Sequence, residues 1–145
     1  MDRRLLILAL GMFALGSDSF VIAGVLPQIS HGFDVSIGAA GQLTTVYALA
    51  YAFALPTAAA IFAHVERKKL MLSGLGIFTA ANLATAWAPS FALAIAARAL
   101  AGLGAAMYAP TVAGSGASIM PPEKHGFALS VVIAGLCQAP FQIWL

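Results

Sequence analysis

The sequence predicts an all-α membrane protein with about five transmembrane helices. Of its 145 residues, 61% are hydrophobic and only 8% are charged, whereas soluble domains carry about 25% charged residues. The mean hydropathy is +0.95. A soluble core could not hide this much apolar surface, so lipid has to be the solvent. Because lipid offers no partner to backbone N–H and C=O groups, each span is expected to satisfy them internally, as a helix.

Several apolar stretches reach or approach the roughly 20 residues that a membrane-spanning helix needs. We place the spans at about residues 5–26, 39–63, 70–88, 91–113 and 127–145. Pro27 closes the first and Pro89 follows the third. The first stretch follows two arginines, as in a signal peptide, but it is too long for the apolar part of one. We therefore expect a retained helix and, over residues 1–145, a partial transmembrane bundle.

The basic residues outside the spans predict the orientation. They precede the first span, separate the second from the third, and separate the fourth from the fifth. These residues are Arg3, Arg4, Arg67, Lys68, Lys69 and Lys124. All three places fall on the same side of the membrane, which the positive-inside rule makes cytoplasmic. We expect a cytoplasmic N-terminus and a cytoplasmic loop that contains Arg67 and Lys68.

Two charged residues, Asp18 and Arg98, lie inside apolar spans. A charge near the centre of a membrane helix costs about 2.5–3.5 kcal/mol on insertion scales, so such residues are usually functional. With a rise of 1.5 Å per residue, both lie roughly 10–12 Å below the outer surface. We predict that they face each other or one water-filled cavity, where Asp18 could gain a proton from one side and release it to the other. The alternative is a plain ion pair that only fixes helix packing.

Small residues follow Arg98 at helical spacing. Gly102, Gly104 and Ala105 belong to this run, and residues of this size let a neighbouring helix approach the backbone. Residues 102–104 also superficially resemble a dinucleotide-binding turn, but they lie in the middle of a span with no preceding strand. Helix packing is therefore the role that we predict for them.

The second span carries a polar stripe that includes Gln42, Tyr47 and Tyr51. The two tyrosines are one turn apart and share a helix face. These side chains could line a substrate path, or they could form hydrogen bonds between helices or anchor the helix at an interface. For Asn82, in the third span, we favour a hydrogen bond that helps the helices to pack.

The remaining composition argues against several other classes of protein. A single cysteine, Cys137, excludes an internal disulfide and a cysteine metal cage. His31, His64 and His125 lie far apart without paired ligands, so we expect no metal and no cofactor. We find no nucleophile–base pair or phosphate loop, and expect no enzyme. The few positive charges lie at helix ends, which does not favour nucleic-acid binding.

Three segments resemble the N-terminal part of major facilitator superfamily transporters, in particular the drug:proton antiporters and arabinose-efflux-like permeases of bacteria. Residues 13–29 are similar to the first-helix signature of that group, an acidic residue followed by Leu-Pro-x-Ile. Residues 97–106 resemble the fourth-helix motif Arg-x-x-x-Gly-x-Gly-Ala-Ala, whose Arg, matched by Arg98, is linked to proton coupling in the family. Residues 121–126 are similar to the connection that leads into helix five.

The chain also departs from the family pattern. The group often carries Glu one position after Asp18, where Ser19 stands. The family's loop motif Gly-x-x-x-Asp-Arg-x-Gly-Arg-Lys would fall on residues 59–68, where only Arg67 and Lys68 match. In helix five, Gly135, Ala139 and Pro140 partly match the antiporter motif Gly-x-x-x-Gly-Pro-x-x-Gly-Gly. Residues 141–145 fit no part of it, so the tail near Cys137–Leu145 diverges from the family.

The resemblance implies a proton-coupled secondary transporter that exports a small molecule such as a drug or a sugar. Its partners would be the lipid bilayer, the substrate and protons, in the inner membrane of a bacterium. Family members have two six-helix halves that move against each other, so this chain would need further helices or a partner chain in order to transport. A non-transporting truncated membrane protein and a small oligomeric multidrug-resistance-like exporter are the alternatives.

Overall fold

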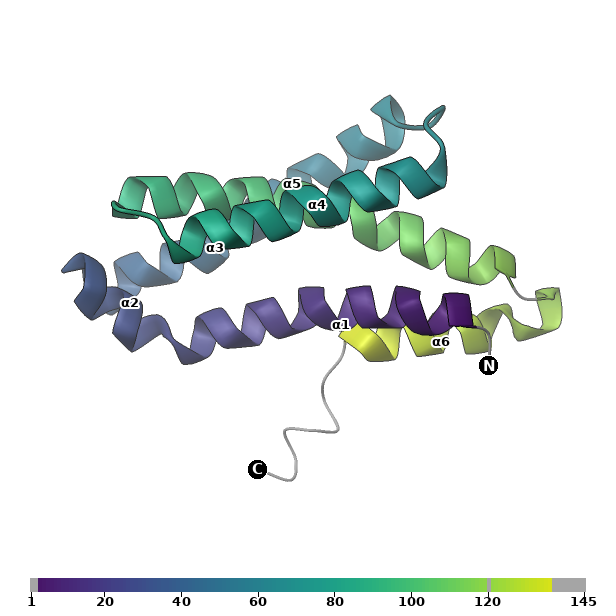
Figure 1. Cartoon of the computed structure of the whole chain (residues 1–145), viewed down its shortest axis with the longest axis horizontal. Coiled ribbons are helices and arrows are strands. Elements are labelled where there is room, and N and C mark those ends of the chain that lie inside the picture. Colours follow the sequence, from purple (N-terminus) through teal and green to yellow (C-terminus); the bar gives the residue numbers. More distant parts are fainter. Residues whose placement is uncertain (1–2, 120, 137–145) are drawn as a thin grey trace, which may run out of the picture. The chain divides into compact units, whose positions relative to one another are not determined.

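The computed structural model describes residues 3–119 and 121–136, and these residues form helices without any strand. The elements are α1 (Arg3–Gly24), α2 (Leu26–Phe33), α3 (Ile37–Ile61), α4 (Arg67–Ala86), α5 (Phe91–Ile119), the 3-10 helix η1 (Pro122–Lys124) and α6 (His125–Leu136) (Figure 1). The prediction of an all-α protein is confirmed. Part of the fifth expected span, residues 137–145, lies outside the described residues.

Three of the described helices are long and apolar enough to cross a membrane: α1, α3 and the Phe91–Gly116 part of α5. At 1.5 Å per residue, the 29 residues of α5 extend over about 43 Å. That length exceeds a hydrocarbon core of about 30 Å. The helix continues to Ile119, beyond the expected span of about residues 91–113, and Pro110 lies inside it.

The chain divides into two compact units, whose boundaries fall within α1 and α5. One unit comprises the described parts of Met1–Phe20 and Ala109–Leu145, and the other comprises Val21–Tyr108. The second unit contains α2, α3, α4 and the first part of α5. It is the unit that holds the candidate site.

The first part of α1 separates into two faces with the periodicity of a helix. Its buried residues recur every three or four positions: Leu5, Leu8, Met12 and Leu15. Large apolar side chains between them are exposed, among them Leu6, Ile7, Leu10 and Phe13. Exposed apolar surface on this scale marks contact with a membrane or with another protein. In a membrane helix it is the surface on which lipid packs.

The end of the first span differs from the sequence-based expectation. Helix α1 ends at Gly24, and a second helix, α2, begins at Leu26 with Pro27 in its first turn. Pro27 was expected to close this helix. A proline is also well tolerated at the start of one, because the N–H that it lacks would have no partner inside the helix. The 27–38 connection is therefore partly helical.

Local hydrogen bonds connect α2 to α3. Asp34 ends α2 in the left-handed conformation with φ of 53°, and Val35 N–H donates to the carbonyl oxygen of Ser30 at 3.0 Å. Ser36 then caps α3, since its Oγ accepts a hydrogen bond from Ala39 N–H at 3.1 Å. These bonds satisfy backbone groups that the helix ends would otherwise leave open.

Candidate functional site: a buried arginine among three helices

The candidate site centres on Arg98, whose side chain is 0% exposed. Its Nη1 donates a hydrogen bond to Asn82 Oδ1 on α4 at 3.0 Å. Its guanidinium carbon lies 4.6 Å from the centre of the Tyr47 ring on α3. Arg98 itself belongs to α5, so one side chain makes contacts with both neighbouring helices. All three helix segments belong to the same compact unit.

These two contacts offset part of the cost of burying the charge. A hydrogen bond to a charged group contributes about 1.5–3 kcal/mol, and a desolvated cation–π contact contributes about 2 kcal/mol. The penalty for burying an ion in a protein is several kcal/mol. The contributions are therefore of the same order as the cost. Arginine does not lose its proton in proteins, so the site is a fixed positive charge.

Gly102, one turn after Arg98, brings α5 against α3. A Cβ atom at this position would lie 2.5 Å from the Tyr47 carbonyl oxygen and 3.0 Å from Ala50 Cβ. The backbone of α5 therefore touches the backbone of α3 beside the residue whose ring covers the guanidinium. Only glycine leaves room for this approach.

Gly104 brings α5 equally close to α4. A Cβ atom here would lie 2.7 Å from the carbonyl oxygen of Gly74 and 2.7 Å from the backbone nitrogen of Phe78. Gly74 faces the same contact from the other side, where an added Cβ would lie 2.9 Å from the carbonyl oxygen of Gly104. In Figure 1, α4 runs alongside the first part of α5. The pair of glycines sets the distance between these two helices.

Alanines complete the buried face of α5 around Arg98. Ala94, Ala101 and Ala105 are fully buried, and Ala97 is nearly so. Leu100 and Leu103 lie on the exposed side of the same helix. The small residues thus face the neighbouring helices, and the large ones face outward.

Asp18 is half-buried on α1, in the unit formed by the two ends of the chain, whereas Arg98 belongs to the other unit. Their pairing stays a prediction.

The polar stripe of α3 divides between different environments. Tyr47 is half-buried and contacts Arg98. Tyr51, one turn later, is also half-buried, and its backbone nitrogen borders Gly102. Gln42 is exposed. Within this stripe the Tyr47 ring contacts the Arg98 guanidinium, whereas Tyr51 meets the site through its backbone at Gly102.

The basic residues expected in the cytoplasmic loop begin α4. Arg67 and Lys68 are its first two residues, and both are exposed. Lys69 Nζ lies 3.4 Å from Glu66 Oε2 in an exposed ion pair. Exposed pairs of this kind contribute little to stability.

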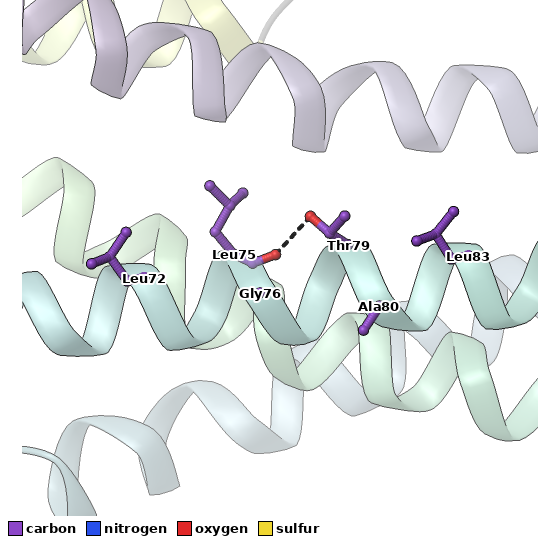
Figure 2. A pocket seen from close by; sticks show the side chains of 6 residues that line it. All are labelled: Leu72, Leu75, Gly76, Thr79, Ala80 and Leu83. Atoms are coloured by element: carbon purple, nitrogen blue, oxygen red, sulfur yellow. Dashed lines mark hydrogen bonds between the residues drawn. The ribbon is translucent and has the colours of Figure 1, made fainter.

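A shallow apolar depression lies on α4 (Figure 2). All of its lining residues belong to this one helix: Leu72, Leu75, Gly76, Thr79, Ala80 and Leu83. The Thr79 hydroxyl donates to the Leu75 carbonyl oxygen at 2.8 Å, within the helix. Since the polar group is already satisfied there, the surface suits hydrocarbon better than a polar ligand. Within the described residues, no three or more His, Cys, Asp or Glu side chains lie together as a metal ion would need.

Sequence reasoning missed two features of the site. It favoured a packing hydrogen bond for Asn82 but did not connect that residue with Arg98. It also overlooked Gly74, which meets Gly104. The sequence did contain a signal for the contact of Gly74, since Gly74 and Gly76 lie within one apolar span. A glycine in a helix, however, does not reveal which neighbouring helix it meets.

Long apolar helices and a charge buried between them by small residues define a helical integral membrane protein. Residues 8–140 match the family model described as Major Facilitator Superfamily. The chain belongs to this superfamily. As the family and the spanning helices indicate, it is an integral protein of the bacterial inner membrane.

Several curated proteins are similar to the chain over most of its length. The uncharacterized MFS-type transporter YbcL of Bacillus subtilis is 35% identical over 91% of this chain and 34% of its own length. The inner membrane transport protein YdhP of Escherichia coli is 32% identical over 97% of this chain and 38% of its own length. The chloramphenicol resistance protein of Streptomyces lividans is 31% identical over 93% of this chain and 34% of its own length. The chain spans about a third of the length of these relatives.

Proposed function

We propose that this chain is the N-terminal part of a proton-coupled transporter that exports a small molecule. The observation that carries the proposal is the fully buried Arg98 in a helix of membrane-spanning length. Membership in the Major Facilitator Superfamily and the similarity to proteins named as transporters support it. One relative is named for chloramphenicol resistance, which favours drug export over sugar export.

In the proposed mechanism, Arg98 supplies a fixed positive charge and Asp18 carries the proton. A carboxylate next to an arginine is stabilised in its charged form, and it accepts a proton more readily when the two groups separate. A cavity that opens alternately to the two sides would change this distance. Proton release and binding would then occur on opposite sides of the membrane.

The proposal also covers the orientation of the chain in the membrane and the path of the substrate. The N-terminus, Arg67 and Lys68 lie in the cytoplasm, as the positive-inside rule favours. Gln42, Tyr47 and Tyr51 contribute to the substrate path. Transport by alternating access needs two bundles that move against each other, so the second bundle comes from C-terminal helices or from a partner chain.

The size of the native product tests whether the second bundle belongs to the same chain. An antibody against the loop that contains Arg67 should detect, in membranes of the source cells, a band at about three times the 14.8 kDa of this chain, since the chain spans 34–38% of its relatives. A band at 14.8 kDa would mean that the remaining helices belong to another chain, or that the product does not transport.

Transport itself is tested in everted membrane vesicles with radiolabelled chloramphenicol as the probe. We expect uptake driven by an imposed pH gradient, and we expect Asp18→Asn to abolish it while exchange of labelled for unlabelled drug continues. Asp34→Asn is the matched control, because Asp34 is exposed, lies outside the long helices, and has a left-handed conformation that asparagine also tolerates. Gradient-driven uptake that survives Asp18→Asn would refute the proposed coupling.

A further inference from the structure

We propose that Tyr47 and Asn82 are positioning residues that hold the Arg98 guanidinium in one orientation. Tyr47 covers it with the face of its ring at 4.6 Å, and Asn82 fixes Nη1 through its amide oxygen at 3.0 Å. Their role in coupling rests on the proposed function. The positioning itself does not.

The two contacts constrain the guanidinium in different ways. The ring contact restricts movement of the guanidinium carbon away from the ring face, since a cation is attracted to the centre of that face. The hydrogen bond restricts rotation within the plane, because it is directional. Together they leave the guanidinium little freedom, although it stands at the end of a long and flexible side chain.

Both positioning residues are themselves held at a fixed distance from α5. The Tyr47 carbonyl oxygen lies against Gly102, so the α3 backbone cannot come nearer at this point. Asn82 is one turn beyond Phe78, whose backbone nitrogen lies against Gly104. The glycine contacts therefore keep the ring and the amide where the guanidinium needs them.

Neither positioning residue carries a charge, and this property matters for the role that we assign. A carboxylate in place of Asn82 would neutralise Arg98 as well as orient it. An amide and an aromatic ring orient the group but leave its net charge at +1. A carboxylate elsewhere, such as Asp18 in the proposed mechanism, would still respond to the full charge.

Nuclear magnetic resonance of the guanidinium tests the positioning directly. The chain is prepared with ¹⁵N-labelled arginine in lipid nanodiscs, and the Arg98 signals are assigned with Arg98→Lys. We expect resolved Nη proton signals, shifted by the ring current of Tyr47 and slow to exchange with water. Tyr47→Phe should keep these properties, because it retains the ring face. Tyr47→Leu and Asn82→Leu should each speed the exchange by about tenfold or more, the change that 1.4 kcal/mol produces.

Two control variants separate positioning from a general loosening of the helices. Tyr51→Leu makes the same change one turn along α3, and Thr85→Val removes a half-buried hydroxyl that bonds within α4 to the Ala81 carbonyl oxygen at 2.9 Å. Both should leave the Arg98 signals unchanged. Exchange that rises equally in the controls, or stays unchanged in Tyr47→Leu and Asn82→Leu, would overturn the proposal.

The transport assay separates this inference from the proposed function. If Arg98 is held as described and couples protons, Tyr47→Leu should weaken gradient-driven uptake of chloramphenicol and Tyr47→Phe should retain it. If the spectra behave as expected but Arg98→Gln, which removes the positive charge, leaves gradient-driven uptake intact, the positioning is upheld and the proposed coupling is refuted.

Discussion

Replacing Gly102 with alanine should force α3 and α5 apart at the candidate site. The added Cβ would lie 2.5 Å from the Tyr47 carbonyl oxygen, whereas ordinary contact begins at 3.4 Å. The helices would have to separate by about 0.9 Å at this point. The facing atom belongs to the backbone, so no flexible side chain can move aside.

The expected loss of stability follows from this distance. A gap of 0.5–1 Å removes about a quarter to a half of the dispersion attraction between facing atoms. Overpacking of this kind costs about 1–3 kcal/mol. The Tyr47 ring moves with its backbone, so its contact with Arg98 should weaken as well. We expect Gly102→Ala to lower the free energy of unfolding by about 1–3 kcal/mol.

Titration with sodium dodecyl sulfate in mixed micelles, followed by circular dichroism, measures this free energy. Gly76→Ala is the matched control, because Gly76 lies inside α4 with nothing within 4 Å of an added Cβ. That variant should be at least as stable as the wild type, since alanine favours a helix by about 0.5–1 kcal/mol over glycine. If Gly102→Ala proved as stable as Gly76→Ala, the close approach of α3 and α5 would be refuted.

Three further predictions use the same titration. Gly104→Ala should cost about 1–3 kcal/mol, because its Cβ would lie 2.7 Å from the Gly74 carbonyl oxygen; an unchanged midpoint would contradict the contact. Asn82→Ala should cost about 1.5–3 kcal/mol, since it removes a bond to a charged group, and a loss below about 0.5 kcal/mol would mean that the bond contributes little. Ser36→Ala should cost about 0.5–2 kcal/mol, because it removes the cap of α3. Hydrogen exchange at Ala39 N–H should become faster, and unchanged exchange would argue against the cap.

The fold class could be predicted because lipid imposes it. Composition alone identified a membrane chain, and the need to satisfy the backbone then required helices. The helix ends were harder to predict. Proline occurs both after the end of a helix and in its first turn, so Pro27 was compatible with either position. A hydropathy pattern does not distinguish a helix that ends at residue 113 from one that continues to Ile119.

The candidate site could be predicted only in part. Arg98 stood out, because a charge in an apolar span is rare. Its contacts with Tyr47 and Asn82 depend on the rotation of α3 and α4 about their axes, and the amphipathic patterns of these helices are too weak to fix that rotation. Gly102 and Gly104 were identified as packing residues, but they are two positions apart and meet different helices. Sequence spacing alone did not indicate this division.

Lipid as a solvent also determines which residues stabilise the bundle. Trp87 and Phe53 are 81% and 75% exposed, while Arg98 is fully buried. Lipid tails are as apolar as leucine, so the burial of apolar side chains between membrane helices provides little driving force. Close packing and polar contacts between helices have to drive their association instead. In Val21–Tyr108 these contacts include the glycine approaches at positions 74, 102 and 104, the cation–π contact of Arg98 with α3 and its hydrogen bond to α4. A charge that would be a liability in an apolar core therefore helps to hold the helices together in this unit.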